Sequence, residues 1–207
     1  RALVVLSMLH ALMWVGGIAC FTVWPLSDSV RAAATPVFMW NAALLACFLL
    51  ARRKELWLIW VGVAGFFVEV FGVATGFPFG AYVYTGQFGA VAFGTPLVLG
   101  AAWFILIAYA RTLTARLSRS ATVRAAAGAA WMVGMDLIIE PVATGPMGAW
   151  IWLDAGAYYG VPAANFAAWF AISFVMLRVS DGMLSPPRYD FRLAALGASL
   201  LLFFTVI

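Results

Sequence analysis

The sequence predicts an all-α membrane protein, a bundle of about seven transmembrane helices that forms a single integral membrane domain over residues 1–207. The first observation behind this prediction is composition. Hydrophobic residues make up 66% of the chain and charged residues only 10%, with a mean hydropathy of +1.02. Soluble domains carry roughly 25% charged residues, so a soluble fold of this size could not bury so much apolar surface. The second observation is a series of seven apolar runs.

These runs are long enough, or nearly so, to cross a bilayer, which takes about 20 helical residues. The second run is short, and the seventh has no polar stop. The first lacks a small-residue cleavage pattern, so we interpret it as a span and not as a signal peptide. Because the chain opens with Arg1 and not Met, we expect that part of the N-terminus is missing. The predicted helices cover residues 2–24, 35–51, 56–76, 92–112, 125–144, 161–179 and 190–207.

Basic residues fall between the runs, as topology signals do. Three alternate loops and their flanks hold most of them, whereas the other three loops share one, Arg31. The positive-inside rule therefore predicts a multi-pass protein of the cell (inner) membrane with a cytoplasmic N-terminus. This placement also explains the net charge of +4 without a nucleic-acid partner. The basic residues of the three loops are Arg52, Arg53, Lys54, Arg111, Arg116, Arg119, Arg124, Arg178, Arg188 and Arg192.

The connection after the third run is unusual, because it holds no charged residue but four aromatic residues, three glycines and a proline between Thr75 and Gln87. Irregular backbone at membrane depth is tolerated only where it is buried in protein or lines a cavity. We therefore expect a re-entrant or interfacial aromatic loop near residues 76–90. One interpretation is an aromatic belt segment at the membrane surface, and the other is the wall of a pocket for an apolar ligand.

Eight acidic residues are present, and their positions divide them into two groups. Asp28, Glu55, Asp181 and Asp190 lie in loops or at helix ends, where we expect them to be solvated. The others are Glu69, Asp136, Glu140 and Asp154. Three of these lie inside apolar runs, where a carboxylate costs several kcal/mol unless it is protonated or partnered, so each is a candidate functional residue.

Asp136 and Glu140 are four residues apart, which places both on one face of the fifth helix. Two carboxyl groups so close in a low dielectric cannot easily both ionise, so one is expected to keep a proton near neutral pH. Such a pair supplies an acid and a base together. The alternative is a hydrogen-bond network that only packs helices.

Polar and aromatic groups from distant segments are predicted to meet at one membrane face. The third and fifth helices both run outward, so Glu69, Asp136 and Glu140 lie in their outer halves. Asn165, at the start of the sixth helix, lies on the same side. The loop before it, residues 145–160, adds Trp150, Trp152, Asp154, Tyr158 and Tyr159.

Several functional classes are excluded by the residues present. His10 is the single histidine, which rules out bis-histidine haem ligation and histidine-rich zinc sites. Lys54 is the single lysine and lies in a loop, which rules out a retinal Schiff base. Cys20 and Cys47 lie in apolar runs and are interpreted as packing residues. We therefore expect no cofactor and no metal.

Three motifs carry a resemblance to a known family: Glu69-Val-Phe-Gly-Val-Ala-Thr-Gly-Phe-Pro-Phe-Gly-Ala-Tyr-Val-Tyr84, Asp136-Leu-Ile-Ile-Glu-Pro-Val-Ala143, and Gly156-Ala-Tyr-Tyr-Gly-Val-Pro-Ala-Ala-Asn-Phe166. Over residues 60–180 the chain resembles the carotenoid-biosynthesis membrane proteins that include the CruF-type carotenoid 1,2-hydratases, such as bisanhydrobacterioruberin hydratase. One departure is Glu140, where the family pattern has Asp before the proline. The carboxylate is kept, and its reach grows by one methylene.

The resemblance implies a hydratase that adds water across the terminal C=C of an acyclic ψ-end carotenoid, such as γ-carotene or lycopene, to give a tertiary alcohol. Asp136 or Glu140 would donate the proton, its partner would direct water, and Glu69 would tune the shared proton. Asp154 would act as a lid or admit water. The expected substrate-binding residues are Phe77, Phe79, Tyr82, Tyr84, Trp150, Trp152, Tyr158 and Asn165.

Two alternatives stay open at this point. A carotenoid cyclase or isomerase would use the same acid but exclude water. A proton-coupled transporter or carotenoid-binding membrane subunit would use the buried acids without covalent chemistry, although transporters usually show internal repeats. The expected partners are a carotenoid and membrane lipid.

Overall fold

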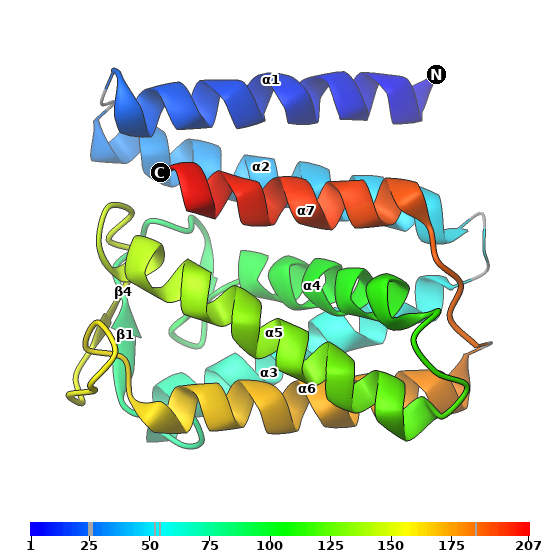
Figure 1. Ribbon diagram of the computed structural model, residues 1–207. Helices are drawn as coiled ribbons and strands as arrows, with labels where there is room; N and C mark the ends of the chain where they lie inside the picture. The colour runs from blue at the N-terminus through cyan, green and yellow to red at the C-terminus, as the bar shows by residue number, and fades with distance from the viewer. Residues whose placement is uncertain (25–26, 52, 54, 185) are drawn as a thin grey trace.

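The computed structural model describes residues 1–24, 27–51, 53, 55–184 and 186–207 (Figure 1). Within these residues the chain forms seven α-helices, one in each predicted run: α1 (Ala2–Thr22), α2 (Asp28–Ala51), α3 (Ile59–Thr75), α4 (Val98–Thr114), α5 (Ala121–Thr144), α6 (Ala163–Met183) and α7 (Phe191–Val206). A short 3-10 helix, Leu56–Leu58, leads into α3. Two helix starts differ from the prediction by more than four residues. Helix α2 begins earlier, at Asp28, and α4 begins later, at Val98, because residues 91–96 form a small hairpin of β2 (Val91–Ala92) and β3 (Thr95–Pro96).

Five of the helices in the described part, α1, α2, α3 (with the 3-10 turn before it), α5 and α6, are long and apolar enough to cross a membrane. Helices α4 and α7 are apolar but shorter, with 17 and 16 residues. Helix α4 is enclosed by α2, α3, α5, α6 and α7, and most of its side chains are buried. At the edge, α1 leaves Val4, Val5 and Leu12 exposed, as expected of a lipid-facing helix. The chain is a multi-pass α-helical membrane protein.

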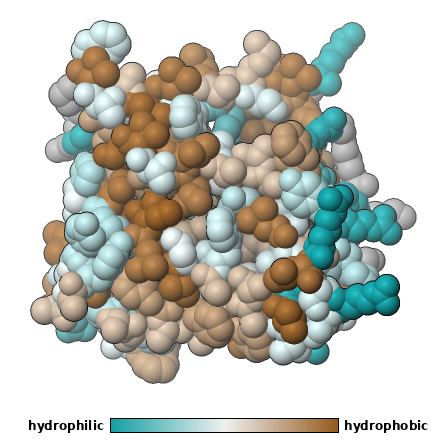
Figure 2. Space-filling model, viewed as in Figure 1, coloured by the Kyte–Doolittle hydropathy of each residue, from teal (hydrophilic) through white to brown (hydrophobic). Residues whose placement is uncertain are grey.

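The helices cross the molecule in alternating directions, so the two chain ends lie on opposite sides (Figure 1). The side that holds the N-terminus, here called the N-side, also carries the α2–α3, α4–α5 and α6–α7 connections. The C-side carries the other three. The most hydrophilic residues gather along the N-side in Figure 2, in agreement with the predicted charge asymmetry. Arg52 and Lys54, which contribute to that prediction, lie outside the described residues.

On the N-side, two acids that were expected to be solvated are buried in ion pairs. The Arg111 guanidinium, from α4, lies 3.2 Å from Glu55 and 3.2 Å from Asp181. Arg124, from α5, reaches the second oxygen of Asp181 at 2.7 Å. The prediction for Glu55 and Asp181 was wrong because long arginine side chains from other helices converge on them. This network links the start of α3 to α4, α5 and α6 at one membrane face.

The remaining two acids of that group mark helix starts. Asp190 caps α7, because its carboxylate accepts hydrogen bonds from the backbone N–H groups of Arg192 at 2.9 Å and Leu193 at 3.2 Å. It also lies 3.7 Å from Arg53. Asp28 begins α2, and its side chain is outside the described part.

On the C-side, the long aromatic connection forms a strand that caps the bundle. Strand β1 (Tyr82–Tyr84) pairs antiparallel with β4 (Trp150–Trp152) of the α5–α6 connection. Successive strand residues point to opposite faces, and here Val83 and Ile151 are exposed. The other face, which turns toward the helices, holds four aromatic side chains: Tyr82, Tyr84, Trp150 and Trp152. The predicted loop near 76–90 is thus part of a two-stranded cap, a pairing that the all-α prediction did not include.

Candidate functional site

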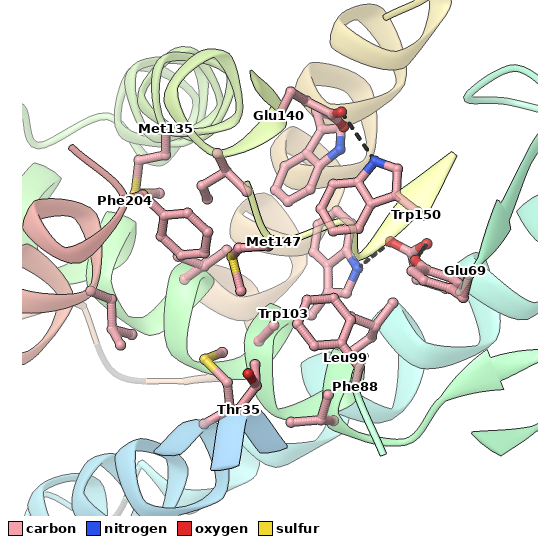
Figure 3. Close-up of a pocket in the computed structure, with 18 of the residues that line it drawn as sticks. Thr35, Glu69, Phe88, Leu99, Trp103, Met135, Glu140, Met147, Trp150 and Phe204 are labelled. Carbon is pink, nitrogen blue, oxygen red and sulfur yellow. Dashed lines mark hydrogen bonds between the residues drawn. The ribbon is translucent and has the colours of Figure 1, made fainter. Parts of the chain in front are cut away.

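A cavity of about 120 Å³ lies beneath this cap, in the C-side half of the bundle. Glu69 and Glu140 both line it, and Figure 3 shows their carboxylates among tryptophan rings. Helices α2 to α7 and both capping connections contribute side chains, most of them apolar or aromatic. The cavity is therefore an apolar, aromatic enclosure with two acidic groups in its wall, a low-dielectric setting in which electrostatic effects are strong.

Glu69, on α3, is buried and bonded by three donors. One carboxylate oxygen accepts the Tyr82 hydroxyl at 2.7 Å and the Tyr84 hydroxyl at 2.9 Å. The other accepts the Trp103 indole N–H at 3.0 Å (Figure 3). Hydrogen bonds from three donors stabilise the ionised form of a carboxylate. These three donors therefore offset part of the cost of burying a charge on Glu69.

Two glycines of α3 allow these donors to approach. A Cβ on Gly72 would lie 2.7 Å from the Phe79 ring and 2.8 Å from the Tyr82 hydroxyl. A Cβ on Gly65 would collide with the Trp103 side chain. Without those methyl groups, the capping strand and α4 pack directly on α3 on either side of Glu69.

The two tyrosine hydroxyls stay donors. Tyr82 and Tyr84 lie in β1, outside the membrane-spanning helices. Burial raises the pKa of both hydroxyls, and the nearby charge of Glu69 raises it further. Because ionisation would leave a buried phenolate beside a carboxylate, both groups remain protonated at neutral pH and above.

Glu140, on α5, has a matching arrangement supplied mainly by β4. One of its oxygens accepts the indole N–H of Trp150 at 3.1 Å and that of Trp152 at 2.9 Å. Its other oxygen accepts the Asn165 amide at 3.3 Å. The two tryptophans alternate with exposed Ile151, so one strand face delivers both N–H groups to a single carboxylate oxygen.

Asp136 lies one turn before Glu140 and differs from both glutamates. It is 1% exposed, and the Asn165 amide donates to one of its oxygens at 2.7 Å. Its second oxygen has no hydrogen-bond partner among the described residues. Three carboxyl groups in one dry region cannot easily all ionise. Asp136, with a single donor, is the group that best fits the neutral, protonated form, and Asn165 links it to Glu140.

Aromatic faces make up much of the cavity wall. Trp103 and Trp169 stack with ring centroids 4.6 Å apart and an interplanar angle of 18°. The ring centroids of Tyr82 and Trp152 lie 5.1 Å apart, and those of Phe88 and Trp150 lie 6.1 Å apart. Such rings can stabilise a cation over their faces. The rings carry no net negative charge, so they and the two carboxylates would stabilise a cation in different ways.

The structure brings together most of the sequence-predicted site residues. Glu69, Glu140, Asn165, Phe79, Tyr82, Tyr84, Trp150 and Trp152 line the cavity. Asp136 lies directly behind Asn165. Trp103, Trp169 and Phe88 also line it but were missed. Trp169 lies one helical turn after Asn165, a spacing that could have identified it, whereas Trp103 lies within an apolar run with no distinguishing neighbour.

Besides Asp136, three predicted residues lie outside the cavity wall. Phe77 is 69% exposed and packs edge-on against Phe71, with the two ring centroids 6.3 Å apart. The Tyr158 hydroxyl donates to the backbone carbonyl of Leu137 at 2.7 Å, which turns its ring along the outside of α5. Asp154 is exposed and accepts the Ala81 N–H at 2.7 Å, so its carboxylate ties the two capping connections together.

The described part of the chain contains no group of three His, Cys, Asp or Glu side chains arranged to hold a metal ion. The groups that surround the carboxylates are N–H and O–H donors. Chemically, the site can hold, release and accept protons beside an apolar ligand. It can also stabilise a positive charge on that ligand with carboxylates and aromatic faces.

Comparison with known proteins gives two matches. A sequence model of the family described as "Carotenoid biosynthesis protein" matches residues 32–207. Bisanhydrobacterioruberin hydratase of Haloarcula japonica is 31% identical to this chain over 143 residues, which is 64% of this chain and 46% of that protein. The chain thus spans about half the length of the curated relative that it matches. No solved structure matches it significantly.

Proposed function

This chain belongs to the carotenoid biosynthesis protein family, and we propose that it is a carotenoid hydratase. It would add water across the terminal C=C of an acyclic ψ-end carotenoid, such as lycopene or γ-carotene, and give a tertiary alcohol. It would do so from the cell (inner) membrane, with its N-terminus in the cytoplasm and residues 1–207 acting as one domain. The observation that carries the proposal is the pair of cavity carboxylates, each held by N–H or O–H donors within an apolar, aromatic enclosure.

In the first step, Glu140 gives its proton to the alkene. The proton forms a C–H bond at the chain carbon, and the carbon that bears two methyl groups becomes a tertiary cation. Glu140 suits this role better than Asp136, because Glu140 lines the cavity. The indoles of Trp150 and Trp152 then stabilise the carboxylate that remains, which makes the acid stronger. The Asn165 amide donates to both Asp136 and Glu140, so it positions the two carboxyl groups relative to each other.

In the second step, water attacks the cation. Aromatic faces lower the energy of the cation by about 0.5–2 kcal/mol per well-placed ring. As the C–O bond forms, the water must lose a proton, and we assign Glu69, whose carboxyl group accepts three hydrogen bonds in the cavity wall, as the base that accepts it. Transfer of that proton from Glu69 back toward Glu140 through cavity water completes the cycle. No atom is gained or lost except the added water.

The similarity to bisanhydrobacterioruberin hydratase favours hydration over cyclisation, and Glu69 offers the attacking water a base on the cavity wall. Product mass is the test. In a lycopene-producing host that expresses the full chain, the proposal predicts carotenoids that are heavier than lycopene by one or two molecules of water. A new product with the same mass as lycopene would instead identify a cyclase or isomerase. Unchanged lycopene beside a well-expressed protein would count against both activities.

A further inference from the structure

The cavity extends well beyond the carboxylates. A second region of its wall, here called the apolar arm, is formed by Met39 of α2, Leu106 of α4, Met135 and Ile139 of α5, and Leu201 and Phe204 of α7. Figure 3 shows Met135 and Phe204 on the side of the cavity away from Glu69. The side chains of the apolar arm offer no hydrogen-bond donor. One end of the cavity is therefore acidic and aromatic, and the other is apolar without any acidic group.

The apolar arm runs across the bundle and not along it. Met39 lies in the first half of α2, and Leu201 and Phe204 lie near the end of α7, so both segments belong to the C-side half, as Glu69 and Glu140 do. A chain that followed the helix axes toward the N-side would pass into the ion-pair network around Arg111. The lining residues extend sideways from the carboxylates, toward α7.

We propose that the apolar arm binds the isoprenoid chain next to the reacting end group, so that the substrate lies across the bundle with its terminal double bond at Glu140. This inference rests on the proposed hydratase function and names the residues that hold the substrate for it. A cavity of about 120 Å³ takes only the end of a carotenoid, so the rest of the molecule must continue from the arm into the lipid.

The chemistry of the arm fits such a chain. A hydrocarbon has no polar group to satisfy, and aliphatic and methionine side chains contact it through dispersion without demanding a fixed partner. The carboxylates at the opposite end of the cavity orient the substrate, because the cation that forms at the reacting double bond is stabilised near them and the rest of the hydrocarbon chain is not. Helix α7 thereby acts as a substrate-binding element, although it supplies no acid and none of the cap.

Filling the arm tests the inference. Leu201→Trp and Ile139→Trp add bulk from two different helices, so a folding defect in one leaves the other to decide. Leu202→Trp is the matched control, because Leu202 is the next residue of α7 but is 54% exposed on its outer face. Each protein is purified in detergent from a lycopene-producing host, and total bound carotenoid per protein is measured by visible absorbance. Monodisperse elution serves as the folding check.

We expect the wild type and Leu202→Trp to retain carotenoid, and Leu201→Trp and Ile139→Trp to retain about ten-fold less, a change of about 1.4 kcal/mol in binding. Equal retention by all four proteins would overturn the inference, as would a wild type that binds none. Failure of the proposed function looks different. In that case the wild type retains lycopene and its arm variants lose it, but none of the proteins yields a hydrated product.

Discussion

Removing one of the two indole N–H groups that donate to Glu140 tests whether these hydrogen bonds make Glu140 a stronger acid. Trp152→Phe keeps an aromatic ring in the cavity wall but deletes the donor that lies 2.9 Å from the carboxylate. A hydrogen bond to a charged group contributes about 1.5–3 kcal/mol. That charge appears on Glu140 only as the proton leaves, so the loss falls on the transition state. We expect the hydration rate to fall about ten- to one-hundred-fold.

The assay is the initial rate of hydrated product formed from lycopene in isolated membranes, normalised to the amount of protein on a blot. Trp169→Phe is the matched control, because Trp169 lines the same cavity but, among the described residues, no hydrogen bond joins it to either glutamate. Its rate should stay close to that of the wild type. A Trp152→Phe enzyme that is as fast as the Trp169→Phe control would refute the idea that the indoles stabilise the ionised acid.

Three further predictions address packing, stability and topology. Gly65→Ala places a methyl group against the indole that bonds the α3 carboxylate, so activity should fall while Gly134→Ala, which meets open space, keeps it. Asp181→Ala removes the carboxylate that pairs with buried Arg124 and one of the two described carboxylates that pair with Arg111, and should cost about 3–5 kcal/mol; a melting temperature in detergent equal to that of the wild type would disprove this. Reporter fusions after Arg119 should be cytoplasmic and those after Gly148 should not; equal signals would show that the helix count is wrong, and reversed signals would show that the orientation is wrong.

The helices were largely predictable because each apolar run is a local feature of the sequence. The seven runs and the alternating loop charges predict seven helices with ends on alternate sides, and the described residues of the structure have this arrangement. The cap was not predictable in this way. The β1–β4 pairing joins residues about 70 positions apart. The sequence pattern within either short strand does not indicate which segment pairs with it. The same non-local cause explains Glu55 and Asp181, whose arginine partners come from other helices.

Within the site, the prediction depended on the free-energy cost of burying acidic side chains and on the spacing of these residues along the helices. Acids inside apolar runs are expensive, so Glu69, Asp136 and Glu140 were identifiable from the sequence, and helix direction placed them at one depth. Aromatic residues carry no such cost. Sequence position alone therefore could not separate Trp150, which bonds Glu140, from Phe77, which is exposed at the surface. Burial of an aromatic side chain is decided by the fold around it.

The most direct test of the account compares Glu140→Gln with Asp136→Asn. Each amide keeps the shape of the carboxyl group but is far too weak an acid to protonate an alkene. Removing a general acid costs about 10²–10⁴-fold, so Glu140→Gln should insert normally and leave lycopene unhydrated. Asp136→Asn, behind the cavity wall, should slow the reaction less. The measurement is the carotenoid profile of a lycopene-producing host beside a membrane blot. The account predicts unreacted lycopene with Glu140→Gln, and full hydration by that variant would contradict it.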